Sequence, residues 1–230
     1  MIGDMKNVVI TGGSDGIGEA LAKSLGSGYH ITLLARNKAK LEGLAAELGC
    51  DFVVCDVRKS GEVAAAFTEI KARRGPIDIL INNAGVIVNG DLAETPYETI
   101  EAVMDTNAKG AIFVTKACLE IMKPQKQGLI INVISTAGIT AKPNRSVYNA
   151  SKWAMTGFTK AIQEEAAAYG VRVTGLYPGT VKTELFSKAG LEIHGPALDT
   201  AQIVRAVIFV LEADNNTLIA EIGVRPFESR

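Results

Sequence analysis

The stretch Thr11-Gly12-Gly13-Ser14-Asp15-Gly16-Ile17-Gly18 follows a short apolar run at residues 7–11 and opens a segment of helical period at residues 16–25. Glycines between a strand and a helix permit a tight turn, and the helix N-terminus offers unpaired N–H groups and a positive dipole to a phosphate. The stretch predicts a dinucleotide cradle. Its glycine spacing differs from the common Gly-x-Gly-x-x-Gly, so the prediction rests on this mechanism, and a turn without a ligand stays open.

Outward from this loop, short apolar runs alternate with longer segments of helical period, which is typical of βαβ units around a parallel sheet. We predict an α/β fold with one Rossmann-type, doubly wound domain over residues 1–230. Its seven-stranded parallel sheet is flanked by helices on both faces. The predicted strands are residues 7–11, 30–35, 51–55, 77–82, 129–134, 171–176 and 217–222, and the predicted helices are 16–25, 38–48, 60–74, 96–108, 111–122, 146–169 and 200–212.

Composition limits the partners. The chain has 230 residues, 47% of them hydrophobic, and a formal net charge of -1, which suits one well-buried core. The basic residues are dispersed, so we expect neither nucleic acid nor an anionic membrane surface as a partner. The densest basic cluster, Lys71, Arg73 and Arg74, precedes Gly75 and indicates a helix end.

The three cysteines, Cys50, Cys55 and Cys118, show no Cys-x-x-Cys spacing. They are interpreted as buried thiols in a reducing compartment, without a metal. We see no apolar core of a signal peptide and no uncharged apolar stretch long enough to cross a bilayer. The expected location is the cytoplasm.

The end of the second predicted strand bears on the cofactor. In a Rossmann half an acid there binds the ribose 2′-hydroxyl, whereas an arginine suits a 2′-phosphate. Here the sequence reads Ala35-Arg36-Asn37, which favours NADP(H) over NAD(H), unless Arg36 is only a solvated loop cation. Asp15 argues the other way, because its carboxylate would repel that phosphate.

Tyr148 and Lys152 are four residues apart in a predicted helix and therefore share one face. A nearby ammonium favours the phenolate, so Lys152 is expected to lower the pKa of Tyr148 toward neutrality. Tyr148 is then a plausible acid and base. An ordinary amphipathic helix with one tyrosine and one lysine is the alternative.

Taken together, these motifs closely resemble the short-chain dehydrogenase/reductase family, whose order and spacing match from residue 7 to about residue 183. The resemblance is carried by Thr11-Gly12-x-x-x-Gly16-Ile17-Gly18, Asn82-Asn83-Ala84-Gly85, Asn107, Ser135, Tyr148-x-x-x-Lys152 and Pro178-Gly179. It implies a nicotinamide-dependent oxidoreductase on one Rossmann domain.

The resemblance also implies four catalytic residues. Tyr148 is the general acid/base, Lys152 tunes it and binds the nicotinamide ribose, and Ser135 holds the substrate oxygen. Asn107 completes a water relay. Without the family, Ser135 would be an ordinary turn serine and Asn107 a polar residue inside a helix.

The implied cofactor-binding set is larger. Asp56 and Val57 correspond to the adenine-contacting position, although an acid near a helix N-cap is the alternative. Asn83 and its neighbours would face the cofactor or merely fix nearby backbone, and the backbone of Val181 and the hydroxyl of Thr183 would hold the carboxamide. The full set is Gly12, Ser14, Asp15, Gly16, Ile17, Gly18, Arg36, Asp56, Val57, Asn83, Ala84, Gly85, Tyr148, Lys152, Pro178, Gly179, Val181 and Thr183.

A substrate lid is expected at about residues 184–198, where the family places one. Its apolar residues, including Leu185 and Phe186, suit a small or medium, fairly apolar carbonyl or alcohol substrate, although they could simply pack the lid on the domain. The family pattern also implies a homodimer or homotetramer paired through predicted helices 111–122 and 146–169. Trp153, Met155 and Phe158 would supply that face or belong to the core.

The leading hypothesis is an NADP(H)-dependent carbonyl reductase or alcohol dehydrogenase. Two alternatives remain: a catalytically silent NADP-sensing or regulatory protein, and a dehydratase or epimerase of the same fold. A binding module has no need of a tuned phenol, which argues against the first alternative.

Overall fold

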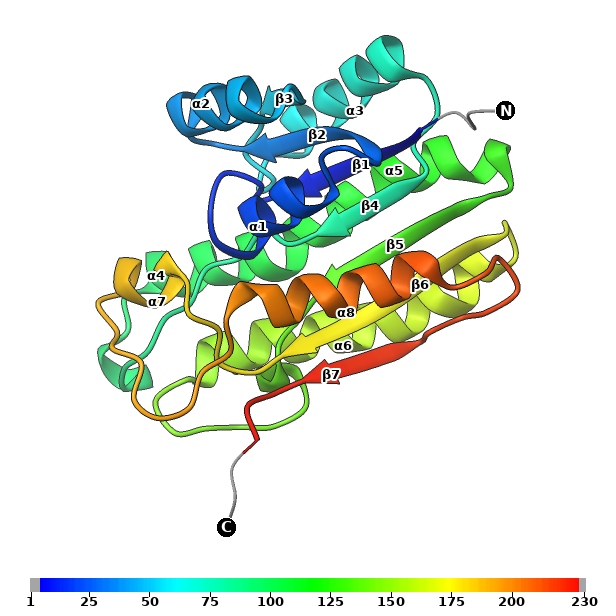
Figure 1. Ribbon diagram of the computed structural model, residues 1–230. Coiled ribbons are helices and arrows are strands. Elements are labelled where there is room, and N and C mark those ends of the chain that lie inside the picture. The colour runs from blue at the N-terminus through cyan, green and yellow to red at the C-terminus, as the bar shows by residue number, and fades with distance from the viewer. Residues whose placement is uncertain (1–4, 228–230) are drawn as a thin grey trace.

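The computed structural model describes residues 5–227, and a seven-stranded sheet forms its centre (Figure 1). The strand order is β3-β2-β1-β4-β5-β6-β7 and every neighbouring pair is parallel, so the predicted doubly wound sheet is confirmed. The strands are β1 (Lys6–Thr11), β2 (Tyr29–Ala35), β3 (Asp51–Val54), β4 (Ile79–Asn82), β5 (Gly128–Val133), β6 (Val171–Pro178) and β7 (Glu221–Val224).

Helices cover both faces of the sheet, and successive strand residues feed two separate cores. Val8 and Ile10 pack under α1, α2 and α8, whereas Val9 between them packs under α3, α5 and α6. Both faces are therefore apolar, which explains the continuous apolar runs of the sequence. The helices are α1 (Gly16–Leu25), α2 (Lys38–Leu48), α3 (Ser60–Arg74), α4 (Tyr97–Met104), α5 (Gly110–Gln125), α6 (Ser146–Ala167), α7 (Glu184–Lys188) and α8 (Thr200–Glu212).

The predicted break between helices 96–108 and 111–122 is wrong. A π-helical turn, Asp105–Lys109, joins α4 to α5 without interruption. Gly110 keeps helical dihedral angles, and a Cβ at this position would lie 2.8 Å from Cγ2 of Val57. This glycine therefore allows a close approach to Val57 instead of ending a helix.

The last strand also differs from its prediction, residues 217–222. It begins at Glu221, opposite Gly175 of β6, and ends at Val224. Thr217 lies in a turn, where its amide donates to the carbonyl of Asp214 and its carbonyl accepts from Arg172. Because both backbone groups of Thr217 are bonded outside the sheet, pairing with β6 begins later, where the carbonyl of Ala220 accepts from the amide of Gly175 (2.9 Å).

Other expectations can be placed on the fold. Cys55 and Cys118 are buried and Cys50 is half-buried, and the three basic residues before Gly75 occupy the last turn of α3 as predicted. Of the proposed interface residues, Met155 belongs to the core, whereas Trp153 is 52% exposed. Within residues 5–227 no helix has the length and apolar character needed to cross a membrane.

Candidate functional site

A cleft of about 790 Å³ lies where the carboxyl ends of the strands meet. β1 is hydrogen-bonded to both β2 and β4, so the chain reverses its winding direction beside the glycine loop, and ligands of open α/β sheets bind at this point. Every cofactor-binding and catalytic candidate from the sequence lines the cleft except Gly18 and Asn107. Residues separated by up to 171 positions are thus brought to one site.

The glycine loop is held by close contacts that leave no room for side chains. Gly12 has φ +63°, and a Cβ there would lie 2.9 Å from Cα of Ala84; at Gly18 it would lie 2.3 Å from the carbonyl oxygen of Gly12. Gly18 therefore serves the packing of α1 on the loop and does not reach the cleft. The loop thereby presents the α1 N-terminus, a site suited to a phosphate.

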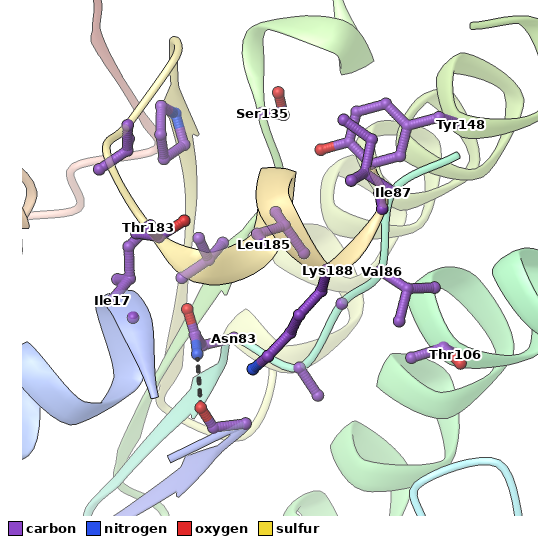
Figure 2. A pocket seen from close by; sticks show the side chains of 18 of the residues that line it. Ile17, Asn83, Val86, Ile87, Thr106, Ser135, Tyr148, Thr183, Leu185 and Lys188 are labelled. Carbon is purple, nitrogen blue, oxygen red and sulfur yellow. Dashed lines mark hydrogen bonds between the residues drawn. The ribbon is translucent and has the colours of Figure 1, made fainter. Parts of the chain in front are cut away.

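Asn83, which directly follows β4, holds this loop in place. Its Nδ2 donates to the carbonyls of Thr11 (3.1 Å) and Gly12 (3.2 Å), and the backbone amides of Asn83 and Ala84 donate to Oγ1 of Thr11. The side chain thus fixes neighbouring backbone at the edge of the cleft (Figure 2), which was the alternative reading of the asparagine pair.

At the opposite end from Tyr148, the cleft is bordered by Arg36, Asp56 and Val57. The Asp56 carboxylate is bonded by the Arg58 guanidinium, with Nε 2.9 Å from Oδ1, and this interaction, aided by Arg36, holds the pKa of Asp56 below its ordinary value. Asp56 does not cap α3, which begins at Ser60. Arg36 is exposed and, within residues 5–227, has no carboxylate within 4.0 Å, so its guanidinium is available to a ligand.

Ser135 and Tyr148 lie at the other end. Ser135 follows β5 with φ +153°, a backbone conformation that L-residues rarely adopt, and its Oγ accepts from the amide of Ala137. Tyr148 comes from the first turn of α6, is 6% exposed, and points its hydroxyl toward the same space as Ser135 (Figure 2). Two hydroxyls can therefore meet one substrate oxygen.

Lys152 shares the α6 face of Tyr148, as predicted, but its effect on the phenol differs from the prediction. Its Nζ donates to the carbonyl of Val133 (3.3 Å) and lies 5.9 Å from the centroid of the Tyr148 ring. Burial lowers the pKa of Lys152 to about 8. Burial also raises the pKa of Tyr148, while Ser135 and the charge of Arg145 lower it. Desolvation of the phenol outweighs the two lowering effects, and the pKa of Tyr148 lies above its ordinary value, contrary to the prediction.

Asn107 lies in the π-helical turn and reaches Tyr148 indirectly. Its side chain exchanges two 2.8 Å hydrogen bonds with the backbone of Val86, and its Nδ2 also donates to Oγ of Ser151 (2.9 Å). The Ser151 hydroxyl donates to the carbonyl of Tyr148 (2.7 Å). Ser151 was missed by the sequence reasoning, although it stands three residues after Tyr148, where one helical turn brings side chains near backbone carbonyls.

The segment after β6 closes the cleft beside Tyr148. The Gly179 amide donates to the carbonyl of Val224 (2.7 Å), and Val181 forms an isolated bridge with Leu198. Pro178, Val181 and Thr183 border the cleft, with Thr183 beside Ile17 in Figure 2. Both ends of the segment are thus tied to other strands or loops, which fixes its path over the cleft.

The predicted lid contains α7, whose Leu185 and Phe186 line the cleft, whereas Leu191 and Ile193 do not. Two basic residues at this end, Lys142 and Arg145, were missed by the sequence reasoning. Arg145 immediately precedes α6 and its Nε donates to Oδ1 of Asn89 (3.3 Å). No local pattern marks these residues, because their relevance depends on the loop that carries them.

The dimensions and chemistry of the cleft fit a dinucleotide. Its volume lies within the range usual for ligand sites, roughly 300–1,000 Å³. Asp15, the N-cap residue of α1, makes no side-chain hydrogen bond to the helix, so that side chain leaves the N–H groups of the first turn for an anion. The glycine loop would hold the pyrophosphate, and the residues around Tyr148 would hold the nicotinamide.

Known proteins resemble this chain in both sequence and fold. The short chain dehydrogenase family profile matches residues 6–193. The 3-oxoacyl-[acyl-carrier-protein] reductase of Homo sapiens is 34% identical, over 90% of this chain and 92% of that protein. An alcohol dehydrogenase from the archaeon Thermococcus sibiricus, complexed with 5-hydroxy-NADP, superposes with a TM-score of 0.90 at 30% identity and 99% coverage of both chains.

A metagenomic short-chain oxidoreductase in complex with NADP has a TM-score of 0.85 at 30% identity, covering 97% of this chain and 98% of that one. Family, fold and cleft therefore agree. The chain belongs to the short-chain dehydrogenase family and is an NAD(P)-dependent oxidoreductase.

Proposed function

We propose that the chain is an NADP(H)-dependent carbonyl reductase or alcohol dehydrogenase in which Tyr148 is the general acid and base. The observation that carries the proposal is the convergence of the Tyr148 and Ser135 hydroxyls at one end of a cleft whose middle is the glycine loop. A bound nicotinamide supplies or accepts the hydride. The side chains of this protein supply the proton and hold the substrate oxygen.

In the reductive direction, Tyr148 donates its proton to the carbonyl oxygen, and Ser135 donates a hydrogen bond to the same oxygen as charge develops on it. The raised pKa of the buried phenol keeps Tyr148 protonated before the reaction. The Lys152 ammonium stabilises the phenolate afterwards and binds the nicotinamide ribose. Asn107 holds the backbone around Val86 and, through Ser151, the first turn of α6.

We assign NADP(H) as the preferred cofactor on the strength of Arg36. Ala35 leaves the end of β2 without an acid, and the Arg36 guanidinium borders the cleft there. The objection from Asp15 is weakened by its ion pairs with Lys188 and Lys40. The loop therefore does not present an uncompensated negative charge to a 2′-phosphate.

The proposed substrate is a small or medium, fairly apolar carbonyl compound or alcohol. Ile87, Leu185 and Phe186 border the space near Ser135 and Tyr148, which supports an apolar substrate body. The chain acts as one catalytic domain in the cytoplasm, assembled as a homodimer or homotetramer. The exposed Trp153 of α6 and Ile112 of α5 support that assembly.

The test is oxidation of NADPH, followed by loss of the dihydronicotinamide absorbance, against a panel of ketones, aldehydes and quinones. Sustained turnover that disappears in Tyr148→Phe and persists in Tyr97→Phe supports the proposal; Tyr97 is 84% exposed and serves as the matched control. Tight dinucleotide binding without turnover on any compound would identify a sensor instead. Conversion of a substrate without net cofactor consumption would identify a dehydratase or epimerase.

A further inference from the structure

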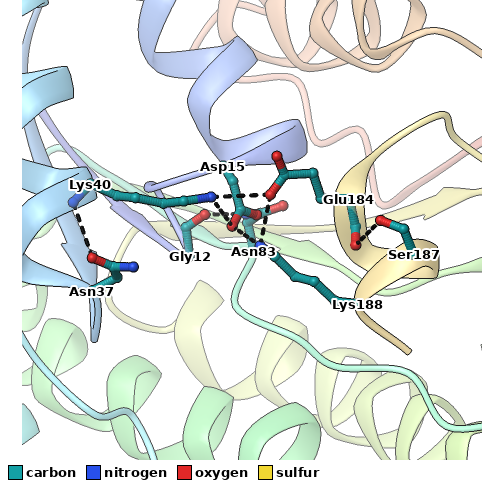
Figure 3. Close-up of polar contacts among 8 residues, drawn as sticks. All are labelled: Gly12, Asp15, Asn37, Lys40, Asn83, Glu184, Ser187 and Lys188. Atoms are coloured by element: carbon teal, nitrogen blue, oxygen red, sulfur yellow. Dashed lines mark hydrogen bonds and ion pairs between the residues drawn. The ribbon is translucent and has the colours of Figure 1, made fainter. Parts of the chain in front are cut away.

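Four charged side chains meet over the glycine loop and join the lid to the nucleotide half of the cleft (Figure 3). Asp15 belongs to the loop, Lys40 to α2, and Glu184 and Lys188 to α7. Lys188 pairs with Asp15 and lies 3.1 Å from Glu184, while Lys40 lies 3.0 Å from Glu184 and 3.7 Å from Asp15. We call these four residues the clasp.

Lys188 is the member of the clasp whose position bears most directly on ligand binding. From α7 its side chain runs across the cleft toward Asn83, the residue that braces the glycine loop (Figure 2). Its ammonium therefore lies against Asp15, beside the N-terminus of α1, where the glycine loop would hold a pyrophosphate. A positively charged ammonium in this position could form an ion pair with a bound phosphate group.

Two further observations show that Lys188 can exchange Asp15 for a phosphate without leaving an unpaired charge. Lys40 lies 3.7 Å from Asp15 and would remain beside the carboxylate. Although burial lowers the pKa of Lys188, the hydrogen bonds that its ammonium donates to Asp15 and Glu184 raise this pKa above its ordinary value, so the side chain is fully charged. The exchange needs only a rotation of a flexible, half-exposed side chain.

We propose that Lys188 is a cofactor-binding residue supplied by the lid, which pairs with Asp15 in the free enzyme and with the pyrophosphate of the bound dinucleotide. Lid closure and cofactor binding are thereby coupled through one ammonium. The inference rests on the proposed function, because it requires a dinucleotide in the cleft. It assigns Lys188 to the phosphate common to NADH and NADPH, whereas Arg36 is assigned to the 2′-phosphate of NADPH alone.

The experiment measures dissociation constants in Lys188→Met, Lys188→Arg and the wild type by quenching of intrinsic Trp153 fluorescence or by calorimetry, without a substrate. Loss of one charge-assisted contact is expected to raise the Kd of NADH and of NADPH by the same factor, about ten-fold. Lys188→Arg should restore most of the affinity. The affinity for 2′-AMP, which lacks a pyrophosphate, should not change.

Lys23→Met is the matched control. Lys23 also lies between two carboxylates, 2.8 Å from Glu19 and 3.3 Å from Glu47, and its side chain is 43% exposed against 50% for Lys188, but it lies outside the cleft. Its dissociation constants should equal those of the wild type. Weaker dependence of NADH affinity on salt concentration in Lys188→Met would further support the assignment.

Unchanged or tighter NADH binding in Lys188→Met, while the wild type binds and turns over NADPH, would overturn the inference and leave the proposed function intact. An increase in Kd for NADPH but not for NADH would move Lys188 to the 2′-phosphate and overturn it as well. If the wild type binds no dinucleotide, both proposals fall together.

Discussion

The two ends of the cleft use charge in opposite ways. At the glycine loop, Asp15, Lys40, Glu184 and Lys188 are charged, partly exposed and mutually paired. At the other end, Tyr148 and Lys152 are buried, and burial lowers the pKa of Lys152 and raises that of Tyr148. The first end is therefore suited to binding a charged ligand that arrives from water, and the second to moving a proton. Variants at the first end should therefore change cofactor affinity, and variants at the second end should change turnover.

The largest effect is expected for Tyr148→Phe, which removes the proposed proton donor and keeps the ring. Because general acid catalysis contributes on the order of 100- to 10,000-fold, kcat should fall by at least about 100-fold. The Kd for NADPH should change little, since the charged end is untouched. Steady-state kinetics and a binding titration measure the two quantities. A similar loss of binding would show that the ends are not separable.

The next largest effect concerns Lys152. Its pKa of about 8 in the folded protein lies below its ordinary value of 10.5, so the folded state resists protonation. The resulting loss of folding stability is absent above the ordinary pKa of lysine and grows as the pH falls between the two pKa values. It is complete below pH ~8. Near pH ~7, the free energy of unfolding of Lys152→Met should therefore exceed that of the wild type by about 1–3 kcal/mol. This difference should shrink toward pH ~10.

Denaturant unfolding at several pH values checks this expectation, with Lys116→Met as the control because Lys116 is 72% exposed. Lys152→Met should also lose turnover while it gains stability. A stability difference that stays constant with pH would mean that Lys152 is solvated in the folded protein, contrary to its burial.

Ser151→Ala interrupts the connection from Asn107 to the backbone of Tyr148. The lost hydrogen bonds should cost about 1 kcal/mol of unfolding free energy and lower kcat about ten-fold, because the first turn of α6 is held less firmly. Ser24→Ala, on the exposed face of α1, is the helical control. If kcat were unchanged while stability fell, Ser151 would serve folding alone.

A smaller effect, confined to the nucleotide end, is expected for Arg36→Gln. Removing one charge-assisted contact should raise the Kd for NADPH about ten-fold and leave the Kd for NADH unchanged. Arg73→Gln, at the end of α3, is the control for loss of a surface arginine. Equal weakening of both cofactors would place Arg36 at a part of the dinucleotide that they share.

Local sequence patterns predicted the fold and the shared helix face of Tyr148 and Lys152, because both follow from short-range rules. Strands that are buried on both faces appear in the sequence as continuous apolar runs, which predicted their positions. The four-residue spacing of Tyr148 and Lys152 placed them on one face of α6. The break between predicted helices 96–108 and 111–122 was wrong, because the glycine at this point, Gly110, is needed for a contact with Val57, far away along the chain. A glycine that permits close packing and one that ends a helix look alike in a sequence.

The clasp could not be predicted for a related reason. Lys188 and Asp15 are 173 residues apart, and Glu184 and Lys40 are 144 apart, so no periodicity connects them. From the sequence alone, the carboxylate of Asp15 was expected to repel a bound phosphate. Only the tertiary structure shows the two lysines that compensate its charge. The pKa of Tyr148 was misjudged likewise, because the spacing of two residues does not reveal how deeply the fold buries them.

The smallest effect is expected for Glu184→Gln, which removes one carboxylate from the clasp. Glu184 is 57% exposed, and ion pairs between exposed side chains contribute little to folding because water and salt screen them. Its pKa is lowered by Lys40 and Lys188, so any contribution that it does make should disappear as the pH falls through the acid range. The denaturation midpoint at neutral pH should therefore match the wild type, whereas Ser151→Ala should shift it. If Glu184→Gln destabilised the protein as much as Ser151→Ala, the clasp would be a structural element of the fold. Its charges could then not be free to rearrange around a ligand.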